Sequence, residues 1–78
     1  MVNDELTETE IEVLEHLLRD GANGSSAIGS AIDRHPNSVS RSLRNLKESG
    51  LVVDKGGHVW TLSDAGLHKI RIILRERE

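Results

Sequence analysis

The sequence predicts an α+β fold that is mainly helical, with three helices, a two-stranded β-hairpin and a final helix. Apolar residues recur at helical spacing in residues 7–20, 25–49 and 64–76. Before the last of these segments, β-favouring runs at 51–54 and 58–62 flank a Lys-Gly-Gly turn. Because the 78 residues contain no linker, repeat or low-complexity segment, we expect residues 1–78 to form one domain.

The first helix is expected to begin after Thr7. Thr7 and Glu10 have the spacing of a capping box, in which each side chain accepts a hydrogen bond from the backbone of the other residue. Leu6 and Ile11 stand at the two positions of a hydrophobic staple. The helix is expected to end at Gly21, which suits a left-handed C-terminal cap.

A short second helix is expected to follow, with Ser25 or Ser26 as its cap. Gly29 lowers the helix propensity of this segment, so packing against another element must stabilise it. The residues on its predicted apolar side are Ala27, Ile28, Ala31 and Ile32.

The third helix is predicted to begin at Pro36, a residue favoured at the first helical position, with His35 as its cap. The sequence Glu-Ser-Gly at 48–50 ends it, and Gly50 lies beyond the last turn. Its core side consists of Val39, Leu43 and Leu46, at positions i, i+4 and i+7. Two helices joined by a turn of three or four residues are typical of a helix-turn-helix motif, here at about residues 25–49.

The opposite face of the third helix is polar and positive. Asn37, Ser40, Arg41 and Arg44 recur at helical spacing, and Ser38 and Lys47 flank them. Arg and Asn side chains can bind base edges in the major groove of DNA, and Ser and Lys can reach phosphate oxygens. On this pattern alone, the alternative is an ordinary solvated helix face.

Charge is distributed unevenly along the chain, which has 13 acidic and 10 basic residues. Residues 1–33 contain eight acids and one base, whereas residues 34–78 contain nine bases and five acids. This asymmetry suggests an anionic partner for the second half. Arg34 adds positive charge beside the third helix, and His35 can cap the helix or meet a phosphate. Backbone N–H groups at residues 36–38 are expected to be unpaired and to favour phosphate.

The final helix is predicted to begin after Ser63, with Leu62 and Leu67 at staple positions. Its apolar side chains exceed what one small domain covers readily, so we expect a homodimer through this helix. The alternative is that Ile72 packs against the first helix. A twofold dimer would place two third helices about one DNA turn apart, on an inverted repeat. The expected interface residues are Leu67, Ile70, Ile72, Ile73 and Leu74.

The stretch SVSRSLRNLKESGLV, then a short hairpin, then WTLSDAG, resembles the winged helix-turn-helix regulators of the MarR-like and archaeal kinds. Residues 46–52 match the Leu-x-x-x-Gly-Leu-Val pattern that ends the recognition helix, and residues 60–66 match aromatic-x-Leu-Ser-x-x-Gly. The resemblance covers about residues 7–74. It implies duplex DNA binding, with the third helix in the major groove and a wing at about residues 51–62 beside it.

By position, the resemblance implies groove contacts from Asn37, Ser38, Ser40, Arg41 and Arg44, and wing-tip contacts from Lys55, Gly56, Gly57 and His58. The chain departs from full MarR-like proteins because it lacks the extra helices of their dimer interface and ligand cleft. We expect a small transcription regulator that binds double-stranded DNA sequence-specifically, with repression favoured over activation. The alternative is a protein-interaction module that uses the acidic first helix and the apolar last helix.

Several function classes are disfavoured by the sequence. There is no Cys, and no histidine pairs with another ligand at helical spacing, so we expect neither a metal nor a cofactor. No nucleophile motif or phosphate loop occurs, so we expect no enzyme activity and see no evident small-molecule ligand. Trp60 is expected in the core because it shares a strand face with Leu62. No apolar run reaches membrane-span length and the start is acidic, so we expect a cytoplasmic protein.

Overall fold

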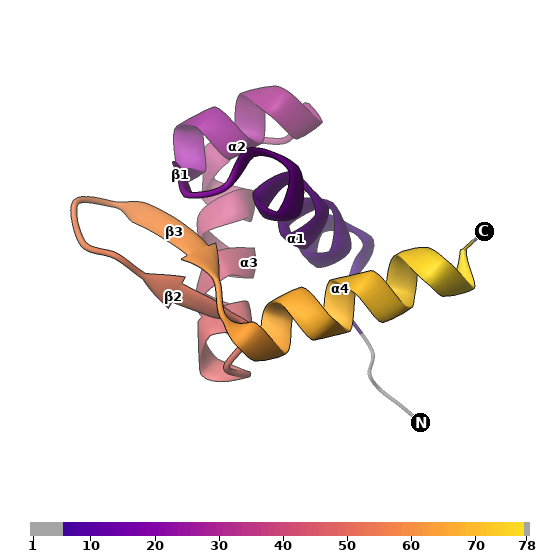
Figure 1. The fold of residues 1–78 in the computed structure, drawn as a ribbon. Coiled ribbons are helices and arrows are strands. Elements are labelled where there is room, and N and C mark those ends of the chain that lie inside the picture. Colours follow the sequence, from indigo (N-terminus) through magenta and orange to yellow (C-terminus); the bar gives the residue numbers. More distant parts are fainter. Residues whose placement is uncertain (1–5, 78) are drawn as a thin grey trace.

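The computed structural model describes residues 6–77 and confirms the expected succession of helices, hairpin and final helix (Figure 1). Its elements are α1 (Glu8–Asp20), β1 (Asn23–Gly24), α2 (Ser25–Ile32), α3 (Pro36–Glu48), β2 (Val52–Asp54), β3 (Val59–Leu62) and α4 (Asp64–Glu76). Strands β2 and β3 form the wing, with residues 55–58 as its tip. In Figure 1 the wing and α4 leave a common base in opposite directions. Within residues 6–77, no helix is both long and apolar enough to cross a membrane.

The sheet has three antiparallel strands in the order β1-β3-β2. The expected two-stranded hairpin is present, and β1 adds a third strand that was not expected. In β1, Asn23 pairs with Trp60 and Gly24 pairs with Val59. The wing register pairs Val52 with Leu62. A strand of two residues has no periodicity, and an Asn-Gly dipeptide favours a turn, so β1 could not be predicted from the sequence pattern.

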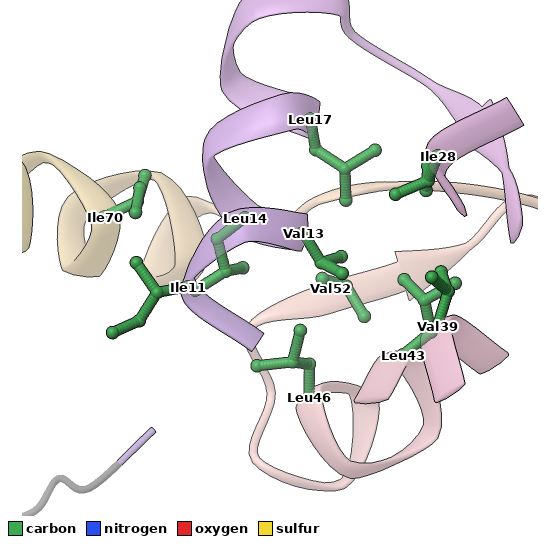
Figure 2. Packing of buried hydrophobic residues seen from close by; sticks show 10 residues of the cluster. All are labelled: Ile11, Val13, Leu14, Leu17, Ile28, Val39, Leu43, Leu46, Val52 and Ile70. Atoms are coloured by element: carbon green, nitrogen blue, oxygen red, sulfur yellow. The ribbon is translucent and has the colours of Figure 1, made fainter. Parts of the chain in front are cut away.

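A single apolar core joins all four helices and the wing (Figure 2). The predicted core side of α3 is confirmed, because Val39 and Leu43 are 0% exposed and Leu46 is 1% exposed. Trp60 and Leu62 pack against the core from β3, also as predicted. The ten buried apolar residues are Ile11, Val13, Leu14, Leu17, Ile28, Val39, Leu43, Leu46, Val52 and Ile70.

Helix α1 begins with the capping box that its sequence predicts. The Glu10 N–H donates to Thr7 Oγ1 at 3.1 Å, and the Thr7 N–H donates to Glu10 Oε1 at 2.9 Å. At the other end, the Gly21 N–H donates to the Leu17 carbonyl at 2.9 Å. Gly21 has φ +80° and ψ −148°, so it needs the freedom of glycine but does not adopt the left-handed helical cap that was expected.

Helix α2 differs from its prediction at the cap and on its apolar side. Gly24 is the cap residue and makes no side-chain cap hydrogen bond, because Ser25 and Ser26 already lie inside the helix. Ile28 is fully buried and Ile32 partly buried, whereas Ala27 and Ala31 are exposed. Helix α2 packs against α3, α1 and β1, with Ile28 and Gly29 as its buried residues.

Gly29 is needed because α2 and the turn after it approach closely. A Cβ at Gly29 would lie 2.7 Å from the carbonyl oxygen of Arg34 and 3.5 Å from the nitrogen of Pro36. The Arg34 N–H donates to the Gly29 carbonyl at 2.8 Å. The low helix propensity of Gly29 is therefore offset by tight packing at the start of α3.

The chain leaves α3 through a Schellman motif. Gly50 has φ +79° and its N–H donates to the Lys47 carbonyl at 2.9 Å. The Leu51 N–H donates to the Leu46 carbonyl at 2.9 Å, which completes the motif and turns the chain into β2.

Ser63 and Gly66 lock the end of β3 onto this turn. The Ser63 hydroxyl donates to the Gly50 carbonyl at 2.6 Å, and the Ser63 N–H donates to the Leu51 carbonyl at 3.1 Å. Gly66 completes the contact, because a Cβ there would overlap the Leu51 carbonyl group. We call this set of contacts, made by Gly50, Leu51, Ser63 and Gly66, the wing-base junction.

We expect Gly66→Ala to destabilise the fold by about 3 kcal/mol, because the added methyl group cannot fit against a rigid backbone carbonyl. The free energy of unfolding in urea measures the loss. Ala65→Gly is the matched control at the exposed neighbouring position and should cost at most about 1 kcal/mol. Equal losses for the two variants would contradict the close approach at Gly66.

Candidate nucleic-acid interface

Helix α3 presents the polar face that its sequence predicts. Asn37, Ser38, Arg41, Arg44 and Lys47 are exposed on it. Ser40 is half-buried, so its hydroxyl is less accessible than the arginines on either side. Ser42, which the core pattern did not include, is 7% exposed and lies on the packed side. The helix therefore separates an apolar side from a polar side that is cationic from Arg41 to Lys47.

The first turn of α3 has no free backbone N–H group, which corrects the expectation of an unpaired phosphate site there. Pro36 has no N–H, and the Asn37 N–H donates to Nδ1 of His35 at 3.0 Å. The N–H groups of Ser38 and Val39 donate to the His35 carbonyl at 3.0 and 3.2 Å. His35 is thus the cap, as predicted, and it uses the donors that a phosphate would need.

The wing tip at residues 55–58 is a tight, exposed turn. The Lys55 N–H donates to the Val59 carbonyl at 2.7 Å, and the Val59 N–H donates to the Gly56 carbonyl at 3.1 Å. Gly56, Gly57 and His58 all have positive φ, which explains the glycines but makes His58 an unusual residue at φ +64°.

Asp54 shapes the wing tip and was not among the predicted site residues. Its Oδ1 accepts a hydrogen bond from the Gly56 N–H at 2.8 Å. This is a local turn in which an Asp side chain binds the backbone two residues on, and its sequence signal is the Asp-x-Gly spacing. The carboxylate also places a negative charge next to Lys55, so the tip is nearly neutral overall.

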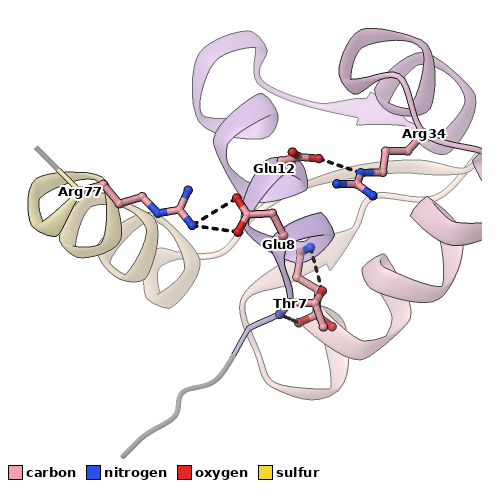
Figure 3. A network of polar contacts seen from close by, with 6 residues as sticks. Thr7, Glu8, Glu12, Arg34 and Arg77 are labelled. Carbon is pink, nitrogen blue, oxygen red and sulfur yellow. Dashed lines mark hydrogen bonds and ion pairs between the residues drawn. The ribbon is translucent and has the colours of Figure 1, made fainter.

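Arg34 is turned towards α1 rather than outward (Figure 3). Its Nε donates to Glu12 Oε1 at 2.9 Å, and this hydrogen bond raises the pKa of the Arg34 guanidinium. The pair connects the turn before α3 to α1 across 22 residues of sequence. A DNA contact by Arg34 would have to share the guanidinium with this carboxylate.

The remaining ion pairs of arginine also involve α1. Arg77 donates to both carboxylate oxygens of Glu8, at 3.0 and 3.2 Å, and Arg19 donates to Glu15 at 2.7 Å. The hydrogen bond from Arg77 lowers the pKa of the Glu8 carboxyl group. Within residues 6–77, the cations without an ion pair are Arg41, Arg44, Lys47, Lys55, Lys69, Arg71 and Arg75. Helix α3 and the wing therefore keep their positive charge free.

A shallow recess between α1 and α2 lies away from this cationic face, and His16 forms part of its wall. His16 is 9% exposed; its Nε2 lies 3.0 Å from Asn23 Nδ2 and its Nδ1 lies 3.4 Å from Asp20 Oδ2. Both ring nitrogens are engaged, so His16 links α1 to β1. In the described part of the chain, no three His, Asp or Glu side chains are grouped to hold a metal ion.

The sequence matches a known family of transcription regulators. The family model described as the sugar-specific transcriptional regulator TrmB matches residues 4–70, which is most of the chain. The chain belongs to the TrmB family. The family consists of transcription regulators and not of enzymes. A search among curated proteins found no significant match.

Solved structures show the same fold in MarR-type proteins. Sco5413 from Streptomyces coelicolor, a MarR family transcriptional regulator, is 30% identical, with a TM-score of 0.83 over 90% of this chain and 52% of that one. YusO from Bacillus subtilis is 22% identical, with a TM-score of 0.84 over 92% of this chain and 55% of that one. A ZitR mutant from Lactococcus lactis, 17% identical, has a TM-score of 0.82 over 96% and 55%. The chain spans about half the length of these proteins.

Five apolar residues of α4 were expected in a dimer interface. In this TrmB-family chain their side chains differ in burial. Ile70 is 0% exposed, so a partner could not touch its side chain without opening the core. Ile73 and Leu74 are partly buried and pack against that core. Leu67 and Ile72 are half-buried outside this packed group, and they are the α4 side chains that remain for a partner.

Because Arg77 lowers the pKa of the Glu8 carboxyl group below its usual value, the ion pair makes stability depend on pH in the acid range. The stabilisation is complete above the unfolded pKa and is lost as the pH falls through the lower folded pKa. We expect thermal melts from about pH 7 to about pH 3 to show a smaller acid loss in Glu8→Gln than in wild type. Glu48→Gln removes an exposed carboxylate that has no ion pair in residues 6–77, so this control should behave as wild type. Identical acid profiles for wild type and Glu8→Gln would contradict the prediction.

Proposed function

We propose that residues 1–78 form one winged helix-turn-helix domain that binds double-stranded DNA sequence-specifically, with α3 in the major groove. The observation that carries this proposal is the free cationic face of α3. Arg41, Arg44 and Lys47 are exposed and have no ion pair within residues 6–77, while three other arginines are neutralised by α1. Cations left unpaired on one helix face suit a polyanion.

Each side chain on this face has a distinct role in the proposed complex. Arg41 and Arg44 are long enough to bind the O6 and N7 acceptors of guanine, and Asn37 suits the adenine edge. Lys47, at the C-terminal end of α3, suits a phosphate, as do the hydroxyls of Ser38 and Ser40. Base contacts from Asn37, Arg41 and Arg44 would then share one helix face with phosphate contacts from Ser38, Ser40 and Lys47.

The wing is proposed to contribute weakly. Lys55 can reach a phosphate or the minor groove beside α3, with Gly56, Gly57 and His58 shaping the approach. Asp54 lies next to it and repels phosphate, so the tip adds little net attraction. The glycines permit close approach of the backbone to the sugar-phosphate chain.

The acidic α1 is proposed to face away from the duplex. Its carboxylates would be repelled by phosphate, so the field of the chain orients α3 towards DNA. We favour a repressor, because blocking a promoter needs only occupancy of the DNA, and we place its action in the cytoplasm with that DNA. An archaeal source, suggested by the sequence resemblance, remains a prediction.

The decisive experiment measures fluorescence anisotropy of a labelled mixed-sequence duplex at low and moderate salt. We expect Arg41→Ala/Arg44→Ala to lose more than about tenfold in affinity, with a shallower dependence on salt. Arg71→Ala/Arg75→Ala is the matched control, because it removes the same charge from exposed, unpaired positions on α4. Equal losses for both variants would indicate nonspecific attraction, and no binding by wild type at low salt would favour the protein-interaction module.

We also propose a homodimer in which Leu67 and Ile72 of α4 contact the second copy. Sedimentation equilibrium at tens of micromolar tests it, and we expect a dimer for wild type and a shift towards monomer for Ile72→Ser. Leu74→Ser is unsuitable as a control because it would disturb the core. His68→Ser changes an exposed α4 residue instead and should leave the dimer intact. Monomer alone in wild type would rule out this assembly.

A further inference from the structure

We propose that His35 binds a DNA phosphate with its Nε2–H while its Nδ1 caps α3. This inference rests on the proposed DNA binding and adds to it the chemical form of one contact. His35 would act as a neutral hydrogen-bond donor, not as a cation.

The backbone N–H groups in the first turn of α3 are already used in hydrogen bonds. Phosphates often bind backbone N–H groups at helix N-termini. Here the N–H groups of Asn37, Ser38 and Val39 already donate to the ring or carbonyl of His35, and Pro36 has none. A phosphate at this end must therefore be bound by a side chain.

The cap hydrogen bond determines the tautomer of His35. An imidazole nitrogen that accepts a hydrogen bond carries a lone pair, so the Asn37 N–H donating to Nδ1 at 3.0 Å leaves the ring proton on Nε2. The side chain of His35 is exposed. Its Nε2 makes no hydrogen bond to any residue in the described range 6–77. The cap thus produces an N–H donor of fixed tautomer, held at the N-terminal end of α3.

Two effects strengthen the Nε2–H of His35 as a hydrogen-bond donor. The bond from Asn37 draws electron density from the ring, and hydrogen bonds in such a chain strengthen one another. The ring also lies at the positive end of the dipole of a 13-residue helix. Both effects favour a negatively charged acceptor over water. A duplex with α3 in its major groove presents phosphates at the ends of the helix.

The test separates the two nitrogens. His35→Asn keeps a good cap acceptor but has no group in the place of Nε2, whereas His35→Ala removes both functions. We expect His35→Asn to melt within about 2 °C of wild type and to bind duplex DNA about fivefold more weakly. Its salt dependence should match wild type, because a neutral donor releases no counterion. His35→Ala should lose both thermal stability and affinity.

A second measurement does not depend on the stability of the variants. In the duplex selected by wild type, single phosphates are replaced in turn by uncharged methylphosphonates. One replacement should weaken wild type and leave His35→Asn unaffected, because that phosphate has already lost its donor.

Three results would overturn the inference. His35→Asn binding as tightly as wild type would reduce His35 to a cap, while DNA binding by wild type still stood. A salt slope smaller by about 0.9 in His35→Asn would show that the ring binds as an imidazolium. If wild type binds no duplex, the proposed function itself fails and this contact with it.

Discussion

The wing-base junction is the constraint on which the rest of the structure depends. Gly50 adopts φ +79° so that α3 can end, and its carbonyl and that of Leu51 then accept the two hydrogen bonds of Ser63. The same short segment therefore fixes the end of the recognition helix, the spacing of the two wing strands and the start of α4. Gly66 allows α4 to touch this segment directly. The orientation of the wing relative to α3 follows from backbone contacts, which few surface substitutions can alter.

Charge is organised around α1 in a complementary way. The carboxylates of Glu8, Glu12 and Glu15 neutralise three arginines, which lie at the C-terminal cap of α4, in the turn before α3 and in α1 itself. Exposed pairs of this kind contribute little to stability. Their larger effect is on the field of the molecule, because they leave free cations on α3, the wing and α4. An acidic protein can thus present a positive face without any change in its net charge.

Features encoded locally could be predicted from the sequence, and features that need distant partners could not. The capping box of Thr7, the cap by His35 and the core side of α3 depend on residues within one or two turns. Strand β1 exists only because β3 pairs with it, and the ion pair of Arg34 joins residues 22 apart. The N–H groups of the first turn of α3 were wrongly expected to be unpaired, because the sequence predicts the cap residue but not which N–H groups donate to it. Gly66 lies in the aromatic-x-Leu-Ser-x-x-Gly pattern. A glycine is needed there because the carbonyl group of Leu51, 15 positions earlier in the chain, leaves no room for a Cβ.

The number of free cations limits how the proposed complex can work. Arg41, Arg44, Lys47 and Lys55 can neutralise at most four phosphates, and hence give a salt slope no steeper than about −3.6 for one copy. Between about 50 and 200 mM salt, such a slope lowers affinity by roughly 150-fold, so one copy would bind weakly in a cell. Neutral contacts, such as a base contact by Asn37 and the Nε2–H of His35, lose nothing to salt. A second copy on the same duplex raises affinity further, because its binding becomes intramolecular. Specific binding by a domain with so few free cations therefore requires either strong neutral contacts or two linked copies. The free side chains of α3 are suited to the first, and those of α4 to the second.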